Sequence, residues 1–124
     1  MKILFTCLGC VTSSVLARKL RDALVAEGHT VKFQGNISEK DVYKVIQSKK
    51  DYTIAYMHIM RLTIENRKGI VLAFDKILIA PQAEYLLPKV IKASDDKLTR
   101  EHFTIIPGKA YRNVAIDELL SLVR

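Results

Sequence analysis

One stretch near the amino terminus decides the fold: Lys2-Ile3-Leu4-Phe5-Thr6-Cys7-Leu8-Gly9-Cys10-Val11-Thr12-Ser13-Ser14. Its first five residues are mostly apolar and suit a short buried strand. Apolar side chains then recur at helical spacing, with charged side chains on the other side, which predicts a helix capped by Ser13 or Ser14. A strand that passes through a hydroxyl-rich loop into a helix begins a βαβ unit.

The rest of the chain continues this alternation. Further strands and helical stripes alternate at 29–33, 42–46, 75–80, 83–91, 103–106 and 116–123. Gly28 suits the end of the first helix, and Pro88 is expected to kink or split the helix that contains it. The pattern predicts an α/β fold in a single domain over residues 1–124, with an open, mostly parallel sheet of four strands and helices on both faces.

The segment at 52–74 is the weak part of this pattern. Its apolar residues fit neither the helical nor the strand period cleanly. It is interpreted as an extra inserted segment, either a strand pair or a strand followed by a helix, with a turn at 66–69.

Composition narrows the class of protein. The chain has 124 residues, of which 49% are hydrophobic, and a formal net charge of +7. The basic residues are scattered, which suits a solvated surface or steering toward an acidic or phosphate-bearing partner, and no nucleic-acid-binding motif is present. With no signal peptide, no apolar run of bilayer length and no secreted disulfide framework, we expect a soluble cytoplasmic protein without membrane insertion.

The loop after the first strand is the candidate site. Ligands of open α/β sheets bind beyond the carboxyl ends of strands, and the amino end of a helix attracts anions and favours a thiolate. Cys7 is therefore the candidate nucleophile. The other reading is that Cys7 is a small buried hydrophobe that ends a strand. The candidate phosphate-binding residues are Leu8, Gly9, Cys10, Val11, Thr12, Ser13 and Ser14.

Two families share part of this loop. Cys7-Leu8-Gly9 resembles the opening of the low-molecular-weight tyrosine phosphatase loop, but the family's arginine falls at Ser13 and its late Asp-Pro acid has no counterpart. Without that arginine, hydrolysis should be slow and a phosphocysteine should persist. The spacing of Cys7 and Cys10 also resembles a thioredoxin-like redox motif, although the facing proline of those folds is missing.

A third resemblance is the strongest. Cys7 and the hydroxyls at 12–14, together with the run at 75–88 that contains Pro81-Gln82, resemble the IIB component of the lactose/cellobiose (chitobiose) branch of the bacterial sugar phosphotransferase system (PTS). The resemblance covers residues 1–47 and 75–124 and implies a phosphatase-like three-layer sandwich. The family glycine falls at Cys10, and the segment at 52–74 is an insertion relative to that family.

The resemblance implies a phosphotransferase in which Cys7 is the catalytic residue. Cys7 would accept a phosphoryl group from a phosphohistidine of a IIA protein and pass it to a sugar of the cellobiose, lactose or chitobiose class bound by a membrane IIC protein. Pro81, Gln82 and Tyr85 would border the site, and neither a cofactor nor a metal is expected. The alternatives are a thiol–disulfide oxidoreductase using Cys7 and Cys10, and a non-catalytic interaction or regulatory homologue. The three histidines at 29, 58 and 102 are isolated in sequence and are interpreted as structural or surface residues.

Overall fold

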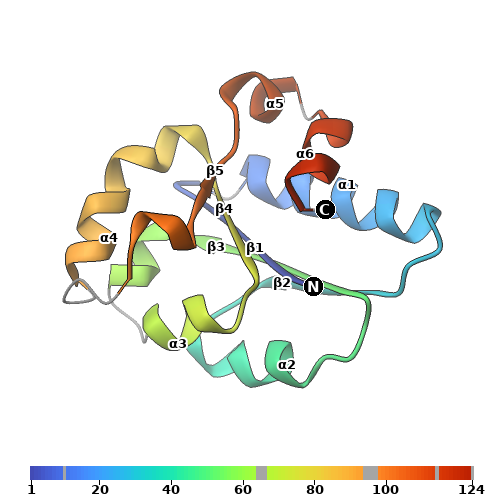
Figure 1. Cartoon of the computed structure of the whole chain (residues 1–124), viewed down its shortest axis with the longest axis horizontal. Coiled ribbons are helices and arrows are strands. Elements are labelled where there is room, and N and C mark those ends of the chain that lie inside the picture. Colours follow the sequence, from blue (N-terminus) through green and yellow to red (C-terminus); the bar gives the residue numbers. More distant parts are fainter. Residues whose placement is uncertain (10, 64–66, 94–97, 114, 124) are drawn as a thin grey trace.

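A computed structural model of the chain describes residues 1–9, 11–63, 67–93, 98–113 and 115–123. Its centre is a single sheet of five parallel strands in the order β2-β3-β1-β4-β5 (Figure 1). The strands are β1 (Lys2–Cys7), β2 (Val31–Asn36), β3 (Tyr52–His58), β4 (Lys76–Ile79) and β5 (Thr104–Ile105). The predicted α/β class is therefore confirmed.

Helices cover both faces of the sheet (Figure 1). One face packs against α1 (Val11–Ala26), α5 (Gly108–Asn113) and α6 (Ile116–Val123). The other face packs against α2 (Val42–Gln47), α3 (Arg67–Leu72) and α4 (Leu87–Ala93). Short 3-10 helices precede or follow these elements: η1 (Glu39–Asp41), η2 (Ile59–Thr63), η3 (Pro81–Leu86) and η4 (Arg100–His102). We call the two packed layers the α1 face and the α4 face.

The predicted count of four strands is wrong, because the segment interpreted as an insertion supplies a fifth. Its strand, β3, lies between β1 and β2 and pairs with both. Most of its side chains are buried, so no alternation of polar and apolar residues marks it as a strand. The apolar run also continues directly into η2 without a turn residue.

The direction of the connections creates a switch point at the centre of the sheet. From β1 the chain crosses to β2 through α1, whereas from β4 it crosses the opposite way to β5 through α4. Because both crossovers must be right-handed, the two helices lie on opposite faces. The loops after the neighbouring strands β1 and β4 therefore diverge, which is where open α/β sheets bind ligands.

Individual residues that favour helix ends gave predictions that the structure tests. Gly28 has φ +94° and follows the end of α1, as predicted. The stripe that contains Pro88 is split into η3 and α4 just ahead of that proline, also as predicted. Because α1 begins at Val11, Ser13 and Ser14 lie inside its first turn, so the prediction that one of them caps the helix is wrong.

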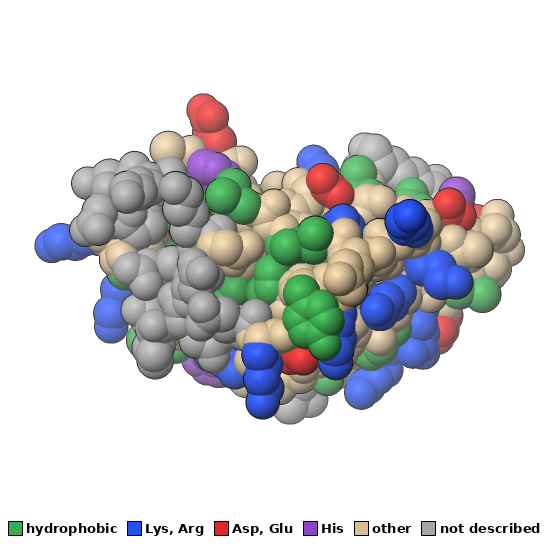
Figure 2. Space-filling model, turned by 90° about the horizontal axis from the view of Figure 1, so that it is seen from below, with side chains coloured by type: hydrophobic (Ala, Val, Ile, Leu, Met, Phe, Trp, Pro, Cys, Tyr) green, Lys and Arg blue, Asp and Glu red, His purple; other side chains and the backbone are tan. Residues whose placement is uncertain are grey.

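The surface is basic without a single basic block. Figure 2 shows the molecule from the side of α2 and α3, with lysines and arginines around a central group of apolar side chains. The exposed large apolar residues of these helices are Tyr43, Ile46 and Leu72. No helix in the described part of the chain is long and apolar enough to cross a membrane.

Candidate active site at the carboxyl end of the central strand

Cys7 is the last residue of β1, the middle strand of the sheet. It is a free cysteine and only 2% exposed. Its side chain belongs to the core cluster of the α1 face, together with Leu16 and Ala17 of α1. The thiol thus lies between the end of the central strand and the first turns of α1, while Cys10 lies outside the described residues.

The first turn of α1 brings a hydroxyl into the same layer. Ser13 is fully buried, and its Oγ has no hydrogen-bond partner among the described residues. It lies about one helical turn before Leu16 and Ala17, on the face of α1 that packs against the sheet. The backbone N–H groups of this first turn have no acceptor within the helix. An anion beside Cys7 would give both kinds of donor an acceptor.

The other residues of the predicted loop lie around this position with different exposure. Leu8, Thr12 and Ser14 are half-buried, and Gly9 is exposed. Val11 is the first residue of α1 and contributes its backbone. Gly9 has no left-handed φ, and a Cβ there would meet nothing within 4 Å, so the loop does not depend on its conformational freedom.

The loop after β4 lies beside the end of β1. The N–H of Ala80 donates to the carbonyl of Thr6 at 3.0 Å, which fixes the start of this loop next to Cys7. Pro81, half-buried, and Gln82, exposed, follow immediately in η3. Tyr85 lies about one turn further on and is 70% exposed. The structure therefore places Pro81 and Gln82 beside the carboxyl end of β1 and leaves the Tyr85 side chain in solvent.

The two arginines of α1 contact an aromatic ring of β2. The guanidinium of Arg18 lies over the ring of Phe33 in β2, 6.0 Å from its centroid, and that of Arg21 lies 4.9 Å from the same centroid. Both arginine side chains thus point toward the edge of the sheet that is formed by β2. The position that carries arginine in the phosphatase loop holds Ser13.

His58 also lies at the carboxyl end of the sheet, beside Cys7, although no spacing in the sequence links the two residues. It is the last residue of β3 and the register partner of Cys7 in the parallel pair β1–β3. Its Nδ1 accepts the backbone N–H of Met60 at 3.1 Å. Only the order of the strands brings positions 7 and 58 together, because β3 lies directly beside β1.

The described residues contain no group of three His, Cys, Asp or Glu side chains that would hold a metal ion. The polar groups near the carboxyl end of β1 are instead the backbone amides of the α1 start, the hydroxyl of Ser13 and the imidazole of His58. These groups hold oxyanions, so the fold and the site define an α/β protein with a candidate anion site around a cysteine.

No protein-family model and no curated protein sequence matches the chain. A de novo designed protein with a P-loop NTPase fold, solved by solution NMR, is 14% identical with a TM-score of 0.44. The match covers 99% of this chain and 93% of the designed one.

Proposed function

We propose that the protein is a phosphoryl carrier of the sugar phosphotransferase type, a IIB-like component that holds phosphate on Cys7. One observation carries the proposal. A free cysteine ends the central strand at the switch point, shortly before the 16-residue helix α1, in which the buried hydroxyl of Ser13 has no acceptor in the described part of the chain. A phosphoryl group on Cys7 would supply that acceptor and would lie at the positive end of the helix.

The reaction proposed is two successive phosphoryl transfers. The Cys7 thiolate attacks the phosphorus of a phosphohistidine on a IIA partner. The P–S bond forms, the P–N bond breaks, and the donor imidazole keeps the electron pair. A sugar hydroxyl bound by a membrane IIC partner then attacks the same phosphorus. The P–O bond forms, the P–S bond breaks, sulfur leaves as the thiolate, and the hydroxyl proton passes to a base of the IIC partner. The site contributes position and charge stabilisation, and no cofactor takes part in these steps.

The arrangement of arginines suits a carrier better than a phosphatase. A phosphatase stabilises its transition state with an arginine fork beside the cysteine. Arg18 and Arg21 instead contact Phe33. A phosphocysteine at this site would therefore react slowly with water and persist until an acceptor docks.

Burial of Cys7 sets a condition on the mechanism. A thiol that is 2% exposed has to be uncovered before a phosphohistidine can reach it. The proposal therefore includes opening of the cover over Cys7 when the donor docks. If no opening occurs, the same burial favours a non-catalytic interaction domain, which is the second candidate.

Intact mass spectrometry tests the carrier role. The protein is incubated with phosphoenolpyruvate, the general phosphotransferase proteins and a panel of IIA proteins, beside a Cys7→Ser variant. One added phosphoryl group on the parent, absent from the variant, is the expected result. An unmodified parent with every donor would overturn the proposal. Reversible oxidation that Cys10→Ser abolishes would then favour the oxidoreductase, and an inert Cys7 the interaction domain.

A further inference from the structure

Cys7 and His58 share one face of the sheet as well as one register position. Along β1, Ile3, Phe5 and Cys7 all belong to the cluster of the α1 face. Their register partners in β3 are Ile54, Tyr56 and His58. Ile54 belongs to that cluster and Tyr56 packs against it, so the alternation of side chains along β3 places His58 on the same face. Neighbouring strands lie about 4.8 Å apart, which puts the imidazole within reach of a group on Cys7.

The hydrogen bond at Nδ1 determines what this imidazole offers. A backbone N–H can only donate, so the contact from Met60 at 3.1 Å requires a lone pair on Nδ1. In a neutral ring the proton is then on Nε2. Since Nδ1 is directed to the start of η2, the Nε2–H is the donor at the other end of the ring. No acceptor for it is found in the described part of the chain.

We infer that His58 is a second catalytic residue, which donates its Nε2–H to a non-bridging oxygen of the phosphoryl group on Cys7. The inference rests on the proposed function and adds a residue to the same site. No proton changes place in this step: the N–H stabilises negative charge on the oxygen while the bonds to phosphorus exchange. The α1 amides and the Ser13 hydroxyl supply further donors from the helix above the same face.

A purely structural role for His58 is the competing explanation. The Met60 N–H bond satisfies the start of η2, so removal of the ring leaves that amide without its partner. The two roles use different nitrogens, and this allows them to be separated. His58→Asn keeps a short side-chain acceptor for the Met60 N–H, in the manner of an Asx turn, and removes the distal donor. His58→Ala removes both.

The test compares these two variants with the parent in single-turnover transfer from a phosphorylated IIA protein, followed by quenching and intact mass. We expect His58→Asn to unfold at the parent's temperature and to transfer about 10- to 100-fold more slowly, the usual effect of losing one hydrogen bond to a charged group. His58→Ala should lose both stability and rate. Transfer by His58→Asn at the parent's rate would overturn the inference.

A second readout does not depend on any partner protein. Long-range imidazole NMR of the parent, titrated with inorganic phosphate, should show the proton on Nε2 and a phosphate-dependent shift of that nitrogen. A proton on Nδ1, or a ring that does not respond to phosphate, would overturn the inference even if Cys7 is phosphorylated. An imidazole that responds as expected, in a parent that no IIA protein phosphorylates, would overturn the carrier role and leave His58 as part of an anion site.

Discussion

The Ser13 side chain is unfavourable in the unliganded protein, because its fully buried hydroxyl has no acceptor among the residues that the structure describes. Ser13→Ala removes that cost and places a better helix former in the first turn of α1. We therefore expect the variant to be more stable by about 1 kcal/mol in urea unfolding. If the Ser13 hydroxyl donates a hydrogen bond to the phosphoryl group, phosphorylation of Cys7 should be slower in the same variant.

A buried hydroxyl that already has a partner serves as the control. Thr53 is 1% exposed, and its Oγ1 donates to Oγ of Ser48 at 2.6 Å. Thr53→Val breaks this bond at nearly constant volume, so it should lower the stability by about 1 kcal/mol and leave phosphorylation of Cys7 unchanged. Opposite signs for the two variants would support a ligand-binding role for Ser13. Destabilisation by Ser13→Ala would contradict it.

Among the secondary-structure elements, the strands with clear local signals were predicted closely, whereas β3 was expected only as a strand of unknown position within an inserted segment. β1, β2, β4 and β5 lie within two or three residues of the predicted runs, because each is followed by Gly, Pro or a polar turn. β3 is buried on both sides and merges with η2, so neither alternation nor a terminator identifies it. Its place between β1 and β2 is a tertiary property, set by pairing between distant segments.

The candidate site also has one part that is local in sequence and another that depends on the pairing of distant strands. The segment from Cys7 to Ser14 is continuous in sequence, so its cysteine and hydroxyls beside the expected start of a helix were enough to make it the candidate site. The pairing of Cys7 with His58 depends on β3 lying beside β1, so a strand expected only within an inserted segment gave no sign that His58 lies near Cys7. The burial of Cys7 was expected only in the alternative interpretation of this residue as a small buried hydrophobe, since its extent depends on how closely α1 packs against the sheet.

Gly28 and Gly9 both lie in loops, but a side chain should have different effects on stability at the two positions. Gly28 follows α1 with φ +94°, a conformation that a side chain makes costly, whereas Gly9 has no such φ and open space around it. We expect Gly28→Ala to lower the free energy of unfolding by about 1–2 kcal/mol. Gly9→Ala should change it by less than about 0.5 kcal/mol. The pair is measured by urea unfolding, and equal losses for both would show that the loop after β1 is also strained.

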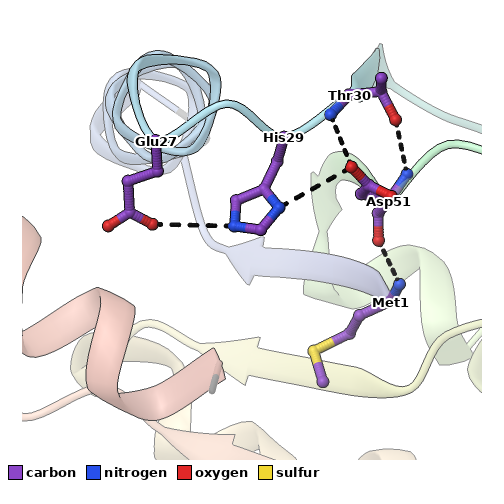
Figure 3. Close-up of polar contacts among 5 residues, drawn as sticks. All are labelled: Met1, Glu27, His29, Thr30 and Asp51. Atoms are coloured by element: carbon purple, nitrogen blue, oxygen red, sulfur yellow. Dashed lines mark hydrogen bonds and ion pairs between the residues drawn. The ribbon is translucent and has the colours of Figure 1, made fainter.

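Across the whole molecule, a polar network joins three segments that are distant in sequence, at the end of the sheet where β1, β2 and β3 begin (Figure 3). The Oδ2 of Asp51, just ahead of β3, accepts the N–H of Thr30 at 2.9 Å, and the N–H of Asp51 donates to Thr30 Oγ1 at 2.9 Å. The same carboxylate lies 3.7 Å from Nδ1 of His29, whose Nε2 lies 3.9 Å from Glu27. The amino group of Met1 donates to the Asp51 carbonyl at 2.6 Å.

This network makes stability depend on pH with a definite sign. The hydrogen bond from the Thr30 backbone is the main cause that lowers the pKa of Asp51 below its ordinary 3.8, and His29 adds a smaller effect. A carboxyl group with a lowered pKa stabilises the fold above its unfolded pKa, and that stabilisation is lost as the pH falls through its folded pKa. The contribution of Asp51 is therefore complete well above pH 3.8 and disappears at more acidic pH.

Asp51→Asn tests this directly, because asparagine retains the shape and the acceptor for Thr30 but removes the charge. In urea unfolding at pH values well above 3.8 the variant should be less stable than the parent, and the two curves should converge as the pH falls below that value. Asp22→Asn is the control, since Asp22 is comparably exposed and contacts only the adjacent Arg21 at 3.0 Å among the described contacts. Because an exposed ion pair of this kind contributes little, that variant should stay close to the parent in stability. A stability difference for Asp51→Asn that persists unchanged into acid would mean that its side chain acts through shape alone, and that charge does not hold this edge of the sheet together.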